Sequence, residues 1–216
     1  MKKVIIGCSV LRREIEVALG SREDFVCIWL EDQLHNVPAT LHQKVQAAID
    51  AAWDAEVIYL LYGHCGRALN GVRARHCPLV LPRVEDCIDV MLYGNPSVSD
   101  LRRTSYFVSQ GWLWGEEGLG YEYDRMKAAR GEKRALRMVQ AMYRNYKYIQ
   151  FLSTGVETPE DRKKCAHVAA VLGLELSELP GSVTLLTDML DGAEDDRFIR
   201  VLPGGEIVEE MFRRLD

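Results

Sequence analysis

The chain has 216 residues, of which 48% are hydrophobic and 27% are charged, and its formal net charge is −5. This size and composition suit one α/β domain, or two small halves that share a core. They exclude nucleic acid as the first partner to propose, because no long basic block occurs. No apolar run approaches the ~18 residues that a membrane-spanning helix needs, so we expect no membrane partner.

The chain begins with two lysines and an apolar run, as a signal peptide does, but the run ends after a few residues at Arg12, Arg13 and Glu14. The apolar region of a signal peptide has roughly 7–15 residues and ends in small ones. We therefore expect a strand that leads into a helix, and a cytoplasmic protein. In such a protein the six cysteines predict free thiols, metal ligands or catalytic groups rather than a disulfide framework.

Strands and helices alternate along the first part of the chain. Apolar runs rich in β-branched residues predict strands at 2–10, 24–32, 56–63 and 78–82. Charge and apolar spacing of helical period predict helices at 11–20, 39–53 and 84–92. A stretch of turn residues follows at 93–100.

The alternation resumes after a segment of β-formers and aromatic residues at 104–115. The same patterns predict a long helical segment at 123–146 with an interior glycine, strands at 147–155, 174–181 and 197–205, helices at 159–173 and 182–192, and a terminal helix after Gly204. This order predicts an α/β fold with a mostly parallel sheet flanked by helices. We expect a single domain over 1–216, with sub-halves 1–100 and 101–216 that could be similar and enclose a cleft.

Several residues capable of chemistry follow the predicted strands. Cys8 ends the first strand, His35 follows the second, Cys65 the third, and Asp86 and Cys87 the fourth. Ligands of parallel α/β sheets bind beyond the carboxyl ends of the strands, where such residues would meet.

Three thiols and an imidazole form a complete tetrahedral ligand set for zinc. Three thiolates alone could instead hold an iron–sulfur cluster with one iron open to substrate. We therefore predict a metal site formed by Cys8, Cys65 and Cys87, with His35 as the fourth ligand, in which the metal activates a small-molecule substrate. Arg83 and Asp86 would act in catalysis by orienting ligands or substrate.

The cysteines and histidines could also have roles other than metal binding. Free cysteines are often simply buried, and Cys27 and Cys165 fit a packing role best. His64 could support the site or be merely exposed. A thiol enzyme would use Cys65 as its nucleophile and a nearby histidine as its base.

Glycines and aromatic residues supply further candidates. Gly63 and Gly66 could belong to a loop whose N–H groups cradle a cofactor's anionic group, although tight turns account for them as well. Trp112 could wall a pocket for a flat cofactor or contact a partner, although such clusters are more often core. The stretches 153–155 and 180–182 each place a hydroxyl and a glycine near a helix start, which suits anion binding or helix capping.

The ordered motifs "CSVL..E", "LH..P", "YG.CG", "LPR..DC", "YF...GW" and a late "STG" resemble the family catalogued as domain of unknown function 1638. The resemblance covers nearly the whole chain, with Ser9 standing where the family pattern has glycine. The matching positions are Cys8, Glu14, His35, Pro38, Tyr62, Gly63, Cys65, Gly66, Pro82, Arg83, Asp86, Cys87 and Trp112.

Members of that family are often encoded near corrinoid-dependent methyltransferases, so the resemblance implies a role in one-carbon metabolism. It also supports the cysteines as a set, but it supplies no reaction. We expect zinc or an iron–sulfur cluster as cofactor, with a corrinoid as a further candidate and a corrinoid protein or methyltransferase as partner. The alternatives are a non-catalytic accessory protein that binds a small molecule or corrinoid, and the thiol enzyme.

Overall fold

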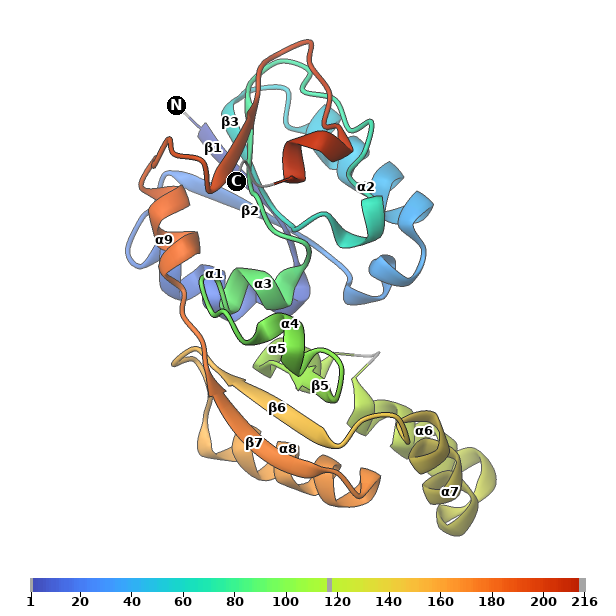
Figure 1. The fold of residues 1–216 in the computed structure, drawn as a ribbon. Helices are drawn as coiled ribbons and strands as arrows, with labels where there is room; N and C mark the ends of the chain where they lie inside the picture. Colours follow the sequence, from blue (N-terminus) through green and yellow to red (C-terminus); the bar gives the residue numbers. More distant parts are fainter. Residues whose placement is uncertain (1, 116–117, 214–216) are drawn as a thin grey trace. The chain divides into compact units, whose positions relative to one another are not determined.

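The computed structural model describes residues 2–115 and 118–213 (Figure 1). The chain forms two compact units: unit 1 comprises Met1–Val90 and Val183–Asp216, and unit 2 comprises Met91–Ser182. This division differs from the expected sub-halves 1–100 and 101–216. The reason is that the chain returns to the sheet of unit 1 after Ser182 and adds a strand to its edge.

The sheet of unit 1 has five strands in the order β2-β1-β3-β4-β8. The strands are β1 (Lys2–Cys8), β2 (Phe25–Leu30), β3 (Ala55–Leu61), β4 (Leu79–Pro82) and β8 (Phe198–Val201). The first four pair in parallel, and β8 pairs antiparallel with β4. The predicted α/β fold with a mostly parallel sheet is confirmed.

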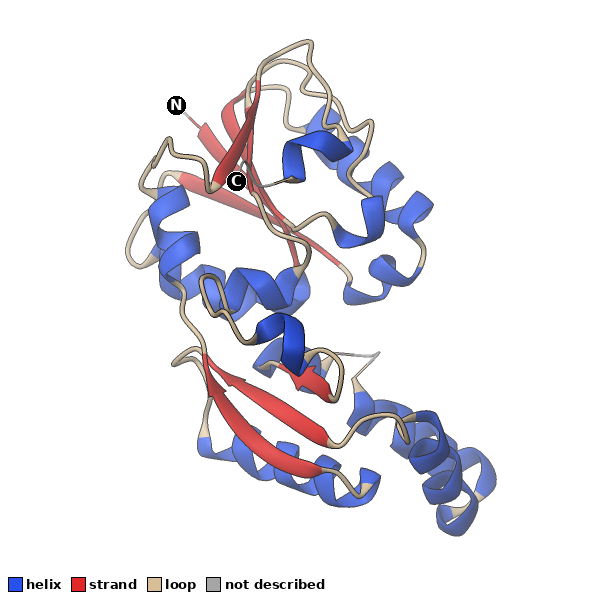
Figure 2. Ribbon diagram, viewed as in Figure 1, coloured by secondary structure: helices blue, strands red, loops and turns tan. Residues whose placement is uncertain are grey.

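Helices cover both faces of this sheet (Figure 2). They are α1 (Arg12–Leu19), α2 (Pro38–Ala51), α3 (Cys87–Met91) and α9 (Thr184–Leu190), with short 3₁₀ turns η1 (Ser9–Leu11), η2 (Asp32–Asn36), η3 (Cys65–Arg67) and η4 (Glu209–Phe212). α1 packs against α9 on one face, and α2 packs against β1 and β2 on the other. The two faces follow because the crossovers β1–α1–β2 and β2–α2–β3 run in opposite directions along the sheet, and crossovers of this kind are right-handed.

The strand order places a topological switch point between β1 and β3. The chain moves from β1 outward to β2, and then crosses to β3 on the other side of β1. Connections therefore diverge above the carboxyl ends of β1 and β3, which opens space for a ligand in sheets of this kind. Cys8 is the last residue of β1, so it lies at this point.

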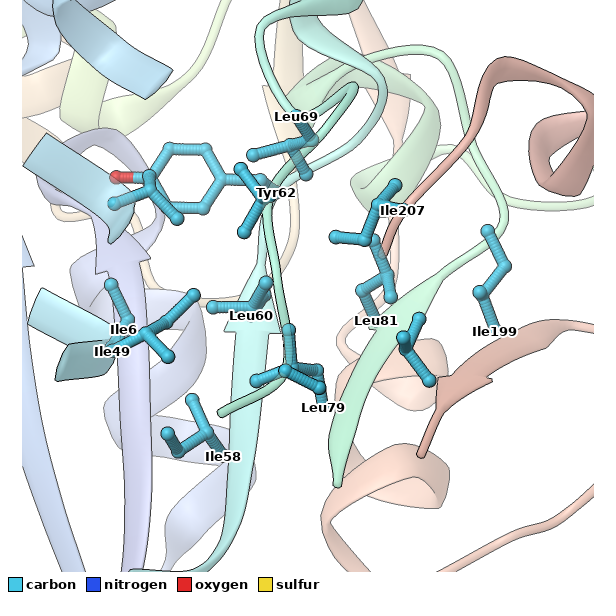
Figure 3. Packing of buried hydrophobic residues seen from close by; sticks show 14 of the residues in the cluster. Ile6, Ile49, Ile58, Leu60, Tyr62, Leu69, Leu79, Leu81, Ile199 and Ile207 are labelled. Carbon is cyan, nitrogen blue, oxygen red and sulfur yellow. The ribbon is translucent and has the colours of Figure 1, made fainter. Parts of the chain in front are cut away.

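The core of unit 1 extends across the sheet from β1 to β8 and includes residues of α2 (Figure 3). β1 and β3 each contain a run of four buried residues, and Ile6, Leu60 and Leu61 have no exposed surface. Such continuous apolar runs are expected where a parallel sheet is covered on both faces. Charged and reactive side chains therefore lie outside these buried runs, toward the two ends of each strand.

Unit 2 contains a parallel sheet of order β5-β6-β7. Its elements are α4 (Val98–Leu101), β5 (Ser105–Val108), α5 (Gln110–Trp114), α6 (Leu119–Arg130), α7 (Glu132–Met142), β6 (Tyr148–Ser153), α8 (Pro159–Leu172) and β7 (Glu175–Pro180). The helical segment predicted at 123–146 is two helices, because Gly131 takes a φ of 77° and ends α6. Within residues 2–115 and 118–213, no helix is both long and apolar enough to cross a membrane.

The terminal helix predicted after Gly204 is wrong for the described part of that segment. Residues 204–207 pair instead with the loop at 71–74, through bonds such as Ile207 N–H to the Val72 carbonyl (2.8 Å). Ile207 is fully buried by this pairing, and only the short η4 turn follows. Burial of the Ile207 side chain against the core outweighs the local helical preference.

The ladder between β3 and β4 continues past both strands. His64 N–H donates to the Val84 carbonyl (2.9 Å), and Cys65 N–H donates to the Glu85 carbonyl (2.8 Å). Gly63 lies so close to this loop that an added Cβ would be 2.5 Å from the Asp86 backbone nitrogen. Gly63 therefore permits the close approach that brings the Cys65 segment beside the segment that carries Cys87.

Replacing Gly63 with alanine should lower the free energy of unfolding by about 2 kcal/mol or more, because the backbone of 85–86 must move. Urea denaturation measures the change. Gly120→Ala, within α6, is the control. Its Cβ would come no closer than 3.5 Å to the side chains of Lys164 and Val168, so stability should stay equal or rise. Equal stability of Gly63→Ala and the native chain would contradict the close approach.

Candidate functional site

The structure brings Cys8, Cys65 and Cys87 together at the carboxyl end of the unit 1 sheet. Cys8 ends β1, Cys65 starts the η3 turn after β3, and Cys87 starts α3 after β4. All three are free thiols on half-buried residues. Cys8 raises the pKa of Cys65, and both raise the pKa of Cys87, so the three thiols lie within electrostatic range of one another.

Burial is the main influence on these thiols. It raises the pKa of Cys8 to about 11 and that of Cys65 to about 12, and it raises the pKa of Cys87 well above the ordinary value. The carboxylate of Asp32 raises the pKa of Cys8 further, and that of Asp86 raises the pKa of Cys65 and Cys87 further. Within the described chain, every charged group that shifts these three pKa values is an acid or another thiol. The thiols are therefore neutral at physiological pH unless a cation joins them.

The turn that carries Cys65 has an unusual backbone. Cys65, Gly66 and Arg67 have φ values of 47°, 65° and 71°, three left-handed residues in succession. Two of them are not glycine, and each such residue costs roughly 1–2 kcal/mol. Strain of this kind is often kept at functional sites, because the surrounding structure over-determines it.

The glycines of this segment have backbone roles. Gly63 allows the contact with Asp86, and Gly66 occupies a left-handed turn position with no atom within 4 Å of its would-be Cβ. The N–H groups of His64, Cys65 and Arg67 donate to the carbonyls of Val84, Glu85 and His64. These N–H groups are thus already engaged, and the predicted cradle for an anionic cofactor receives no support from them.

Two buried polar groups beside the thiols were not predicted as site residues. Asp32 begins the η2 turn after β2 and is 7% exposed, and Tyr62 follows β3 and is 3% exposed. Among the described residues, neither Asp32 Oδ2 nor the Tyr62 hydroxyl has a hydrogen-bond partner. After burial, Cys8 and Cys65 are the largest influences that raise the pKa of Tyr62, which places its hydroxyl near both thiols. The position of Asp32 after a strand end was the available signal in the sequence.

His35 does not take the position predicted for a fourth ligand. It is exposed on η2, and its ring Nδ1–H donates to the backbone carbonyl of Asp32. No group of three or more His, Cys, Asp and Glu side chains in residues 2–115 and 118–213 is arranged so that it could hold a metal ion. The thiols share one neighbourhood, but their side chains are not in a coordinating arrangement.

Arg83 and Asp86, predicted as catalytic, have different surroundings. Arg83 donates through Nε to the Asp196 carbonyl (2.7 Å) and through Nη1 to the Met211 carbonyl, so it fastens the C-terminal segment of unit 1. Asp86 Oδ1 accepts from the N–H groups of Ile88 (2.9 Å) and Asp89 (3.1 Å) at the start of α3. Asp86 therefore helps to position Cys87, whereas the hydrogen bonds of Arg83 lead away from the thiols.

His64 is neither exposed nor directed to a coordinating position. It is 7% exposed, stacks on Phe212 with ring centroids 4.4 Å apart, and donates from Nε2 to Asn70 Oδ1 (3.2 Å). A cavity of about 290 Å³ that is open to solvent adjoins it. The cavity is lined by His64, Arg67, Glu85, Glu209, Phe212 and Arg213.

Trp112 lies on α5 in unit 2 and lines a small hollow with Tyr106, Val108 and Val168. The hollow has a volume of about 10 Å³, which admits roughly one water molecule. A flat cofactor has no room there in the described arrangement, so the predicted cofactor contact of Trp112 is not supported.

The loop at 153–155 holds an anion that the chain itself supplies. Glu157, whose side chain is 1% exposed, accepts hydrogen bonds from the N–H groups of Thr154 (2.6 Å) and Gly155 (3.1 Å). It also accepts from the hydroxyls of Thr154 (3.0 Å) and Ser153 (3.3 Å). The donors of this loop therefore serve an internal carboxylate rather than an external anion.

Glu157→Gln should destabilise the protein by about 1–3 kcal/mol, because an amide cannot accept from all of these donors. Thermal unfolding followed by circular dichroism measures the change. Glu160→Gln, an exposed substitution in the first turn of α8, should change stability little. Equal melting temperatures for the two variants would contradict the internal role of Glu157.

Alkylation of the metal-free protein should be slow at neutral pH. A pKa of about 11 reduces the thiolate fraction of Cys8 about 100-fold relative to an ordinary thiol of pKa 9.0, and Cys65 and Cys87 should react more slowly still. Iodoacetamide labelling at pH 7, read by peptide mass spectrometry, measures each rate against a free cysteine peptide. Rapid labelling of Cys65 would instead support the thiol enzyme.

Comparisons with known proteins agree with the resemblance in the sequence. No curated protein matches the chain. A solved structure that resembles it is the ligand-free, open structure of CD0873, a substrate binding protein with adhesive properties from Clostridium difficile, at 8% identity and a TM-score of 0.30, with 98% of this chain and 93% of that chain covered. A likeness of that size carries no argument about ligand or fold. The profile described as "Protein of unknown function (DUF1638)" matches residues 29–190, so the chain belongs to that family.

Proposed function

We propose that unit 1 is a metal-binding module that holds zinc or an iron–sulfur cluster through Cys8, Cys65 and Cys87. The observation that carries the proposal is the meeting of three thiols, from three adjacent parallel strands, at the β1/β3 switch point. Thiolates are the ligands that both kinds of centre use.

The electrostatics of the thiols favour a cation as their missing partner. Burial and acidic neighbours disfavour the thiolate at all three positions. A bound metal ion reverses this balance, because a coordinating thiol loses its proton outright. The same raised pKa values argue against a nucleophilic cysteine, which needs an electropositive environment.

The donor set fits a soft or borderline metal in its chemistry, but the side chains must move to bind one. A cysteine has a single side-chain torsion before its sulfur, so rotation about Cα–Cβ redirects the thiol without moving the backbone. The strained backbone at Cys65–Arg67 and the cap from Asp86 to α3 would hold the remaining geometry in place.

A zinc ion held by three thiolates would retain a position for substrate and act there as a Lewis acid. The chain would contribute the Tyr62 hydroxyl, which has no partner in the described part of the structure and could donate to a bound substrate. Methyl transfer linked to corrinoid metabolism, with a corrinoid protein or methyltransferase as partner, is the finer proposal that the family resemblance suggests.

A non-catalytic accessory protein is the second candidate, and the cavity beside His64 favours it. Its volume of about 290 Å³ is close to the lower end of small-molecule pockets. Arg67 and Arg213 contribute positive charge, and Glu85 and Glu209 contribute negative charge. Such a lining suits a small zwitterionic or anionic metabolite. Co-purification of a metabolite or partner without metal would support this candidate.

Protein purified without oxygen should contain near-stoichiometric zinc, or iron with acid-labile sulfide and a brown colour. Cys65→Ser should lose the metal and remain folded, because serine removes the sulfur while keeping nearly the same side-chain size at this half-buried position. Elemental analysis and an absorption spectrum measure both results. Cys27→Ser is the matched control, since Cys27 is a half-buried thiol inside β2 and should not affect metal content.

Two outcomes would contradict the proposal. Metal retained at full stoichiometry in Cys65→Ser would remove this thiol from the site. A colourless native protein that contains no metal and takes up none from added Zn²⁺ or Fe²⁺ would refute the module itself.

A further inference from the structure

Four adjacent strands of unit 1 each deliver one potential metal ligand at the carboxyl end of the sheet. In the order β2-β1-β3-β4 these are Asp32, Cys8, Cys65 and Cys87. The parallel register pairs Cys8 with Leu30, so the chain reaches Asp32 two residues beyond the partner of Cys8. Asp32 therefore stands next to the thiol site on the side of β2.

Asp32 is in an unfavourable state without a ligand. It is 7% exposed, and its Oδ2 has no hydrogen-bond partner among the described residues. Burial of a carboxylate oxygen without a partner is costly, and such oxygens normally bind a donor or a metal. The carboxylate is also close enough to raise the pKa of Cys8, so it acts on the thiol site.

We propose that Asp32 is the fourth protein ligand of this site, in place of His35. Side-chain rotation would bring three sulfurs and one oxygen, which the described residues do not hold in a coordinating arrangement, onto a single divalent ion of the zinc type. This inference rests on the proposed metal-binding function and narrows it. Four protein ligands complete the tetrahedral set, so a substrate would reach the ion only by displacing Asp32 or by raising the coordination number to five.

His35 is the weaker candidate on geometric grounds. Its side chain is exposed, and its Nδ1–H is engaged by the carbonyl of Asp32 in the same turn. His35 therefore has a structural role, because its hydrogen bond stabilises the position of Asp32, the first residue of η2. The turn thus presents a carboxylate on its buried side and an imidazole on its exposed side.

The carboxylate also distinguishes between the two kinds of metal centre. Zinc accepts sulfur, nitrogen and carboxylate oxygen ligands at similar distances, in tetrahedral sets. Iron–sulfur clusters are held by thiolates, with histidine as the usual alternative. A buried aspartate beside three thiols therefore favours one divalent ion over a cluster.

Cobalt(II) is a suitable probe, because its sulfur-to-metal absorption bands report the number of thiolate ligands and its visible bands report tetrahedral geometry. Purified full-length protein is stripped with a chelator under anaerobic conditions and titrated with Co²⁺, and then with Zn²⁺ in competition with a chromophoric chelator. The expected result for the native chain is one equivalent bound, in a tetrahedral spectrum with three thiolate ligands.

Asp32→Asn should weaken Zn²⁺ binding by at least about 10- to 100-fold, the loss that follows when even an outer-shell partner of a metal ligand is removed. His35→Ala should bind within a few-fold of the native chain. Asp54→Asn is the matched carboxylate control, because Asp54 is exposed at the amino end of β3, where it pairs with Lys2 (3.2 Å).

A second readout separates a ligand from a merely structural residue. Without metal, Asp32→Asn should raise the melting temperature of the protein, since it removes a buried carboxyl group that has an oxygen without a partner in the described structure. With Zn²⁺ present, the native chain should gain more thermal stability than the variant. A structural aspartate would give a lower melting temperature in both conditions.

The outcomes distinguish the inference from the proposed function. If Asp32→Asn binds Zn²⁺ as tightly as the native chain while Cys65→Ser does not bind it, the role of Asp32 is refuted and the thiol site stands. Loss of binding in His35→Ala, or a brown native protein with acid-labile sulfide, would also overturn it. Failure of the native chain to bind Co²⁺ or Zn²⁺ refutes both proposals.

Discussion

The parallel pairing of β1 with β3 is the constraint on which the rest of this structure depends. Both strands lie in the middle of a sheet that helices cover on both faces, so each has a run of four buried residues before its carboxyl end. The crossovers then diverge to β2 and β4, and the reactive residues of four strands emerge at one edge. The thiol site thus results from the same burial that stabilises unit 1.

The contact at Gly63 fixes how closely these strand ends approach. Because Gly63 has no side chain, the backbone after β3 can lie against residues 85–86 and continue the ladder through His64 and Cys65. The next turn is left-handed over three residues. A close backbone contact and a strained turn together place Cys65 near Cys87, which Asp86 holds at the start of α3.

Polar groups at strand ends are satisfied in one unit and left open in the other. In unit 2 the loop at 153–155 surrounds the carboxylate of Glu157, so this anion site is complete within the chain. In unit 1 the described surroundings of Asp32 Oδ2 and the Tyr62 hydroxyl contain no partner, and the thiols have acids rather than cations as neighbours. The buried polar groups without hydrogen-bond partners are the reason for proposing that the ligand binds to unit 1.

The sequence by itself determined the fold class and most elements, because buried strands and amphipathic helices leave periodic patterns in the residues. It also located Cys8, Cys65 and Cys87, since Cys8 ends a recognisable strand and the other two follow one. Only the tertiary structure decided the division into units, the pairing of 204–207 with an earlier loop, and the surroundings of each polar side chain. Whether an aspartate or a histidine on one short turn faces the buried side depends on packing between distant segments, which no local pattern records.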